Sequence, residues 1–236
     1  MSLLTVVQHF FRRTNITVPT TVFGTTDTQV AQVYAILEEE GNDLAQRGSW
    51  QVLTQEASHT TLAAEDQGAI TTIAGNGFRH IKNETIWDRT DQLPVYGPVS
   101  GQEWQARKAM VDDSPRHQYR IRGGKLLVHP VPPAGNDWRF EYVSHNWILG
   151  ADGTTYKQYF TLDTDTILLP ESLVLMGLRW RWMKEKGLDY AELFRTYELQ
   201  VKDALGRDGG KQTLHMDGEK VRGPGVFVPA GRWITP

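Results

Sequence analysis

Residues 170–183 (PESLVLMGLRWRWM) decide the fold, because their apolar side chains follow helical spacing in two separate sets. The first set forms one stripe along the helix: Leu173, Met176, Trp180 and Met183. The second set lies roughly on the opposite side, because each residue turns about 100° around the helix axis: Leu175, Leu178 and Trp182. A helix that is apolar on two sides is buried on two sides, so this segment needs packing partners on both.

Helical spacing also occurs at the start of the chain and after Asp189. Apolar residues in the segment 3–11 share one face of a short helix that begins near Ser2. Asp27 is suited to cap a second helix, which ends near Gly48 and has this buried stripe: Val30, Val33, Leu37 and Leu44. Asp189 precedes another long stripe: Tyr190, Leu193, Phe194, Tyr197, Val201 and Ala204. The sequence therefore predicts two helices at each end.

The middle of the chain has the alternating pattern of β-strands. Residues 117–122 and 125–130 flank Gly123-Gly124, a two-residue hairpin signature, with Ile121 expected opposite Leu126. Residues 138–143 alternate aromatic with charged side chains, which predicts a half-buried strand. Ser100 and Glu103 have capping-box spacing, which predicts a short helix within this β-rich region.

Together these patterns predict an α+β protein: a four-helix bundle, made of two N-terminal and two C-terminal helices, with an inserted β-rich domain and an extended C-terminal arm. The expected boundaries are residues 1–49, 50–160, 161–210 and 211–236 in that order. The arm contains several Gly and Pro residues around five apolar residues that have no core of their own: Val226, Phe227, Val228, Trp233 and Ile234.

Composition limits the classes of function. The chain has 236 residues, which is enough to bury a core, and a formal net charge of −3, which argues against binding nucleic acid by bulk attraction. The absence of cysteine excludes disulfides, thiolate metal sites and cysteine nucleophiles. Neither a membrane span nor a secretory signal is expected, because no apolar run is long enough and the N-terminus has no basic region before an apolar stretch.

Several segments resemble catalytic or ligand-binding motifs, but each lacks a required residue. Residues 206–211 (GRDGGK) have three residues between the glycines where a phosphate-binding loop has four, and they follow a helix. Asp163 and Asp165 lack the glycine and the next ligand of a calcium loop, so turn and capping roles are favoured. The seven histidines do not pair at zinc-site spacing. We therefore expect no catalytic residue, metal or cofactor, and no enzyme.

The sequence has more apolar residues than the core of a single chain can bury. The excess lies in the second stripe of the segment 170–183 and in the apolar residues of the arm. Contiguous apolar surface of this kind marks contacts with partners. The predicted subunit interface is Leu175, Leu178 and Trp182, and the chain is predicted to be a component of an assembly.

Six segments in order resemble the head-to-tail adaptor proteins of tailed bacteriophages, in particular the group related to the tail tubular protein A adaptors. They are residues 78–90 (FRHIKNETIWDRT), 102–106 (QEWQA), 119–135 (YRIRGGKLLVHPVPPAG), 140–147 (FEYVSHNW), 160–182 (FTLDTDTILLPESLVLMGLRWRW) and 186–198 (KGLDYAELFRTYE). Each motif alone is weak, and the combination with a Trp-rich final helix pair is more specific. The resemblance runs to about Gly210 and is least for residues 211–236.

This resemblance implies a virion protein at the head–tail junction, made in the host cytoplasm. It implies a homo-oligomeric ring, a dodecamer, that joins the portal protein of the capsid to a tail nozzle or tail tube protein. Genomic DNA would pass through the lumen without sequence-specific binding, and no membrane is involved. The apolar residues of the arm would then be the portal-binding residues: Val226, Phe227, Val228, Trp233 and Ile234. The family has no catalytic residues to carry over.

Two alternatives stay open. One is a carbohydrate-binding module, because five tryptophans fall in the β-rich region and exposed aromatic rings bind sugars: Trp50, Trp87, Trp104, Trp138 and Trp147. The alternation around Trp138 favours core packing instead. The other is a hydrolase that uses His145 with Asp163 or Asp165, which lacks any nucleophile signature.

Overall fold

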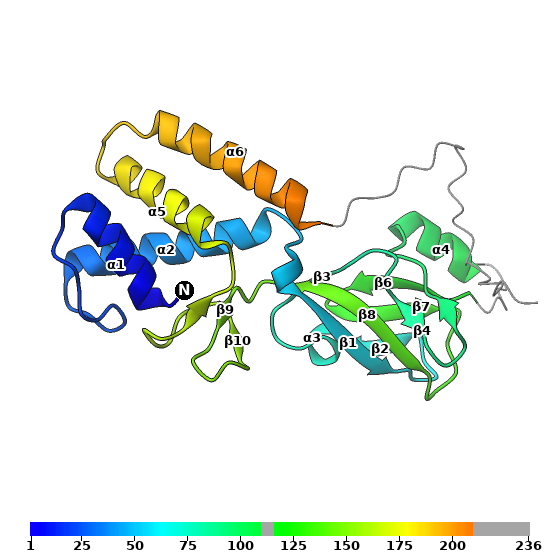
Figure 1. The fold of residues 1–236 in the computed structure, drawn as a ribbon. Coiled ribbons are helices and arrows are strands. Elements are labelled where there is room, and N and C mark those ends of the chain that lie inside the picture. The colour runs from blue at the N-terminus through cyan, green and yellow to red at the C-terminus, as the bar shows by residue number, and fades with distance from the viewer. Residues whose placement is uncertain (110–115, 210–236) are drawn as a thin grey trace, which may run out of the picture.

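The computed structural model describes residues 1–109 and 116–209, and it has a helical end and a sheet end (Figure 1). The described helices are α1 (Leu3–Thr14), α2 (Thr28–Gln46), the 3₁₀-helix η1 (Gln51–Leu53), α3 (Ile70–Ile73), α4 (Gly101–Ala109), α5 (Glu171–Glu185) and α6 (Ala191–Asp208). The described strands are β1 (Thr54–Thr60), β2 (Asp66–Ala69), β3 (Phe78–Ile81), β4 (Trp87–Asp88), β5 (Leu93–Pro94), β6 (Gln118–Arg122), β7 (Lys125–His129), β8 (Asp137–Ser144), β9 (Ile148–Leu149), β10 (Tyr156–Lys157) and β11 (Thr166–Ile167).

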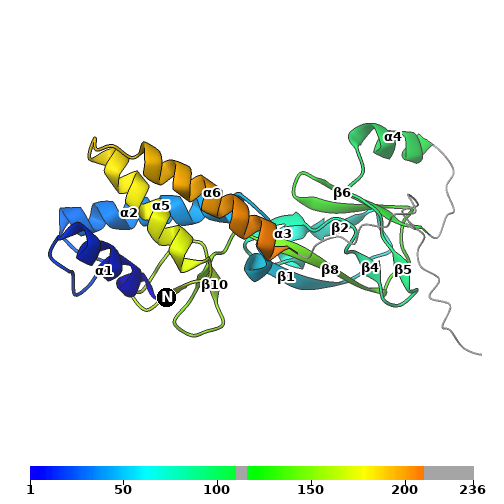
Figure 2. The same ribbon diagram turned by 45° about the horizontal axis from the view of Figure 1, so that its top comes forward.

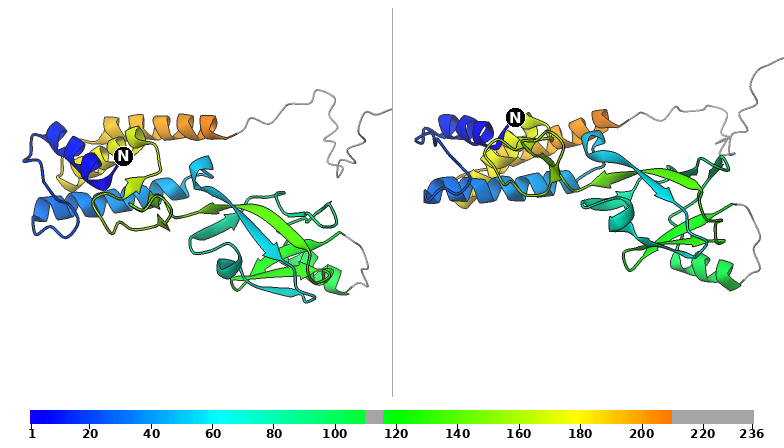
Figure 3. Two further views of the ribbon diagram at one scale, coloured as in Figure 1. Left: turned by 60° about the horizontal axis from the view of Figure 1, so that its bottom comes forward. Right: turned by 90° about the horizontal axis from the view of Figure 1, so that it is seen from below.

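The strands form three antiparallel sheets. The largest has the order β1-β8-β4-β5, and β3 also pairs with β8. A second sheet, β2-β7-β6, lies beside it at the sheet end. The third, β10-β9-β11, lies under the helices, and Figure 3 shows it apart from the other two in two further views. The protein is therefore α+β, as predicted.

Helix α5 is the centre of the helical end. It lies between α1 and α6, and α2 packs across it from the other side (Figure 2). Its burial follows both predicted stripes, because Leu173 and Trp180 of the first and Leu178 and Trp182 of the second are all buried. The two-sided apolar pattern of residues 170–183 is thus satisfied largely within one chain.

The predicted four-helix bundle with an inserted β-rich domain is wrong. The helices are layered around α5, and the sheet β10-β9-β11 completes their core with side chains such as Ile148 and Ile167. Two further helices, α3 and α4, accompany the sheets. The physical reason is that strands β9 and β11 bury apolar side chains in the same core as α1 and α2, so sheet covers a helix surface that the prediction assigned to helix alone.

Local predictions from capping and turn chemistry are confirmed. The Asp27 carboxylate accepts from the Gln29 amide at 2.8 Å, and the Ser100 hydroxyl accepts from the Glu103 amide at 3.2 Å at the start of α4. In the hairpin β6–β7, Ile121 pairs with Leu126. These features depend on neighbours in sequence, so the sequence specifies them.

Two glycines allow close packing at the helical end. A Cβ atom on Gly41 of α2 would overlap the Trp147 ring, and a Cβ atom on Gly177 of α5 would overlap the Glu40 carboxylate. Gly41 therefore has a packing role that outweighs its low helix propensity. Both glycines set how closely α2 approaches its neighbours.

Asp165 anchors the start of the chain to the loop between β10 and β11. Its side chain is fully buried and accepts from the Thr161 amide at 2.8 Å, the Leu162 amide at 3.0 Å and Lys157 Nζ at 3.1 Å. Its backbone carbonyl accepts from the Leu3 amide at 2.9 Å. Burial acts to raise the pKa of Asp165, but the hydrogen bonds and Lys157 outweigh it and hold that pKa below its usual value.

No helix in the described ranges is long and apolar enough to cross a membrane.

We expect Gly177→Ala to lower the free energy of unfolding by about 1–3 kcal/mol, because the new methyl group displaces the Glu40 carboxylate. Gly206→Ala in α6 is the matched control, since nothing lies near its added Cβ, and it should stabilise by up to about 1 kcal/mol through helix propensity. Urea denaturation measures both. Equal stabilisation by the two substitutions would contradict the close-packing role of Gly177.

We expect the stabilising effect of the Asp165 carboxylate to disappear in acid. Because the folded-state pKa is lowered, the stability is present above the unfolded value of about 3.9 and is lost as pH falls through the folded value. Asp165→Asn should therefore cost about 2 kcal/mol at pH 7 and less near pH 3, which lies below the unfolded value. Urea unfolding of both proteins at the two pH values tests this, and a gap of equal size at both would count against it.

Candidate interaction surfaces

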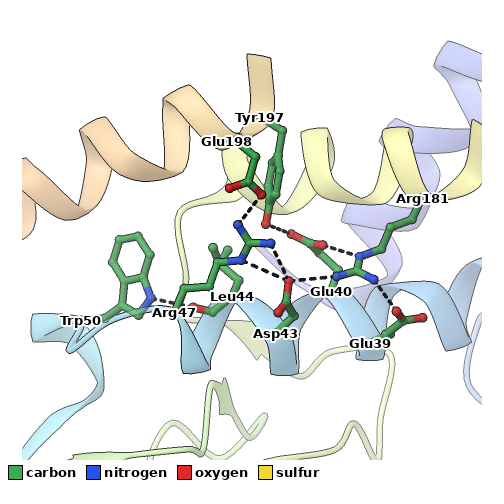
Figure 4. Close-up of polar contacts among 9 residues, drawn as sticks. All are labelled: Glu39, Glu40, Asp43, Leu44, Arg47, Trp50, Arg181, Tyr197 and Glu198. Carbon is green, nitrogen blue, oxygen red and sulfur yellow. Dashed lines mark hydrogen bonds and ion pairs between the residues drawn. The ribbon is translucent and has the colours of Figure 1, made fainter. Parts of the chain in front are cut away.

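A polar network joins α2, α5 and α6 inside the helical end (Figure 4). The Glu40 carboxylate is fully buried, and it accepts from Arg181 Nε at 2.6 Å and from the Tyr197 hydroxyl. Arg181 also donates to Asp43 at 2.9 Å and contacts Glu39. Each helix therefore contributes a charged or hydroxyl group to one buried cluster.

Arg47 extends this network to the end of α2. Its guanidinium donates to Asp43 at 3.0 Å and to Glu198 of α6, and it lies over the Tyr197 ring at 5.2 Å. Beside it, Trp50 Nε1 donates to the Leu44 carbonyl at 2.8 Å. These contacts fix the C-terminal end of α2 against the middle of α6.

Burial raises the pKa of Glu40, while hydrogen bonds from Tyr197 and Arg181 act in the opposite direction. Burial and the Glu40 carboxylate also raise the pKa of Tyr197, so its hydroxyl keeps its proton and donates. The cluster is closed to solvent at Glu40 and Tyr197. Because the Glu40 carboxylate and the Tyr197 hydroxyl are hydrogen-bonded to each other, the cluster is suited to positioning the helices.

An apolar hollow of about 290 Å³ lies between α1 and α5. Its floor includes Phe10 and Trp182, whose rings pack edge to face with centroids 5.6 Å apart. Its other lining residues are Arg13, Thr14, Leu175, Arg179, Met183 and Leu188. Leu188 is 54% exposed, so an apolar side chain stands at the rim beside two arginines.

The predicted subunit-interface residues divide between the interior and this hollow. Leu178 is fully buried within the chain, whereas Trp182 and Leu175 line the hollow. A contact between subunits at these residues stays a prediction. Because Leu178 is buried within the chain, such a contact would be made by Leu175 and by the residues at the rim of the hollow. The predicted arm residues lie outside the described residues: Val226, Phe227, Val228, Trp233 and Ile234.

A second concavity, of about 570 Å³, lies on the outer face of the largest sheet. Trp87 of β4 lines it and is 42% exposed, opposite Arg139 of β8 on one side and Pro94 of β5 on the other. The remaining lining residues are Glu56, Glu84, Thr85, Arg89, Phe140 and Glu141. We call this concavity the Trp87 site.

Asp88 explains why Trp87 faces outward. Its buried carboxylate accepts from Trp138 Nε1 at 2.9 Å, from Asn136 Nδ2 at 2.6 Å and from the Thr90 amide at 2.8 Å. Successive side chains of a strand point to opposite faces, so fixing Asp88 inward fixes its neighbour outward. The alternation of one aromatic and one acidic residue was the available sequence signal, but the two-residue strand was too short to predict.

The other tryptophans of the described part of the chain are buried, including four that were candidates for sugar binding: Trp50, Trp104, Trp138 and Trp147. Trp87 is the candidate that is accessible to a ligand. The Trp138 prediction is confirmed, because Trp138, Phe140 and Tyr142 all lie in the core of the sheet end.

The hydrolase candidates have structural contacts. Asp163 accepts from the Val22 and Phe23 amides, at 3.2 and 2.7 Å, and Asp165 holds the loop between β10 and β11. Burial lowers the pKa of His145, whose backbone amide donates to the Gly77 carbonyl at 2.8 Å. Among the described residues, no group of three or more His, Asp and Glu side chains could hold a metal ion.

No protein-family model matches this chain, and no curated protein sequence matches it.

We expect Glu40→Ala to lower the free energy of unfolding by about 3–5 kcal/mol, because it leaves the largely buried Arg181 without its buried carboxylate partner. Glu39→Ala is the matched control: Glu39 pairs with the same arginine, but its side chain is 67% exposed, so the cost should stay within about 1 kcal/mol. Urea denaturation separates the two outcomes. Similar costs for both would refute the importance of burial here.

Proposed function

We propose that this chain is a structural component of a phage particle: a head-to-tail adaptor that forms a ring between the portal and the tail and surrounds the DNA path. The observation that carries the proposal is the apolar hollow between α1 and α5, with Leu188 exposed at its rim. A hollow with Phe10 and Trp182 at its floor and Leu188 at its rim suits a protein side chain from a partner.

The rim charges favour a partner of complementary charge. Arg13 and Arg179 both line the hollow, so an apolar side chain flanked by carboxylates would fit it best. Further apolar side chains are exposed at the same end of the molecule, on the outer part of α6, among them Phe194 and Leu199. Apolar surface on both flanks of the helical end supports contact with more than one neighbour, as a ring subunit needs.

The resemblance to the adaptor group supports the same function. Its motifs fall on strands β3 and β4, on α4, on the hairpin β6–β7, on β8 and on helices α5 and α6. They therefore cover both the sheet end and the helical end. The net charge of −3 suits a conduit, because a strongly basic lumen would hold DNA and slow its passage.

The test is assembly with a portal. The purified chain is mixed with portal rings of the phage that encodes it, and the mixture is examined by negative-stain microscopy and sedimentation. Portal rings capped by a second ring of this chain are the expected result. A particle that stays monomeric with portal present would overturn the proposal, whereas a monomer without portal would not, because assembly can require the portal as a template.

We expect Leu188→Glu to reduce assembly on the portal at least roughly tenfold, since it places a carboxylate at the rim of the hollow and removes an apolar contact. Leu62→Glu is the matched control, because Leu62 is 50% exposed at the sheet end and lies outside the hollow. Both variants should unfold at the wild-type temperature. Normal portal binding by folded Leu188→Glu would exclude the hollow as the contact.

A further inference from the structure

We propose that the Trp87 site binds a neutral oligosaccharide. The first reason is that the fold keeps the Trp87 indole exposed. Hydrogen bonds hold the side chain of Asp88, the residue after Trp87, inside the sheet end. Trp87 therefore cannot turn into the core without breaking them. A large aromatic side chain exposed in a concavity provides an apolar plane for a ligand.

The second reason is the arrangement of polar groups around that plane. Arg89 donates to Glu56 at 2.6 Å, Arg139 donates to Asp137 at 3.2 Å, and Lys82 lies 3.5 Å from Glu141. One member or both of each pair line the site with Trp87: Glu56, Arg89, Arg139 and Glu141. Sugar hydroxyls both donate and accept, so one hydroxyl can bond a guanidinium and a carboxylate at the same time.

The third reason is charge, which decides between ligand classes. The lining contains Arg89 and Arg139 as cations but three carboxylates, from Glu56, Glu84 and Glu141. Single-stranded nucleic acid also stacks on aromatic rings, but it needs a positive groove for its phosphates. An excess of carboxylates opposes phosphate and favours an uncharged ligand.

The size and character of the site agree with a short oligosaccharide. Its volume of about 570 Å³ lies within the usual range of small-molecule sites. A protein partner is less favoured, because the cores of protein interfaces are depleted in charged residues and this concavity is lined by five. The site is carried by β1, β4 and β8 at the sheet end, whereas the hollow is lined by α1 and α5 at the helical end (Figure 1), so this inference is independent of the adaptor function.

The experiment is a screen of the full chain on an array of neutral glycans, followed by calorimetric titration with the strongest glycan. Binding should be nearly unchanged between about 50 and about 200 mM salt, since no phosphate is involved. Trp87→Ala should weaken binding roughly tenfold or more, Trp87→Phe should weaken it less, and Arg89→Ala should weaken it several-fold.

Tyr159→Ala is the matched control, because Tyr159 is an aromatic residue that is 55% exposed outside the site, and it should bind like wild type. If Trp87→Ala proves unfolded, glycan-induced change in the fluorescence of the wild-type protein gives the second measurement, since Trp87 is the exposed tryptophan of the described part. No binding to any neutral glycan, equal binding by folded Trp87→Ala, or salt-sensitive binding of oligo-dT in place of glycan would each overturn the proposal.

Discussion

The structure depends on burying one carboxylate among three helices. Glu40 of α2 is enclosed, so it must be matched by groups from its neighbours, and Arg181 of α5 and Tyr197 of α6 supply them. Buried charge without a partner costs several kcal/mol, so an arrangement that separated these helices would be strongly disfavoured. Gly177 leaves the space that the carboxylate occupies. The contact therefore determines which helices are neighbours and how closely they approach.

The sequence could predict features that depend on residues close together in the chain. The Asp27 cap, the Ser100 cap and the β6–β7 register all follow from short-range chemistry, and all are present. It could not predict which elements become neighbours. Glu38, Glu39 and Glu40 have the pattern of a solvated helix face, yet Glu40 is buried, because Arg181 lies 141 positions away in the chain and no local pattern links them. The four-helix bundle was wrong for the same reason: periodicity shows that a face is buried and leaves open whether a helix or a sheet covers it.

The candidate contact surfaces show the same limit. The second stripe of α5 was predicted to be a subunit interface, but Leu178 and Trp182 are buried within their own chain and Leu175 is half-buried. The exposed apolar surface is shifted toward Leu175 and Leu188, at the junction of α1 with the end of α5. The direction of Trp87 is likewise decided by distant groups, since Asn136 and Trp138 of the segment around β8 fix Asp88. Tryptophan content alone could not separate this residue from those that are buried.

The hollow and the Trp87 site are formed by different elements, so the functions proposed for them are separable. The hollow is formed by α1 and α5, and its floor belongs to the core of the helical end. The Trp87 site is carried by β1, β4 and β8, whose inner faces belong largely to the core of the sheet end. A substitution at the rim of either surface leaves the other core intact, so the proposed assembly and the proposed glycan binding can be tested one at a time. A subunit fixed in a ring through its helical end would present its sheet end as a separate module, and repetition around the ring would multiply a weak affinity for a repeated glycan. Weak binding by the single chain would then still be effective in the assembled state.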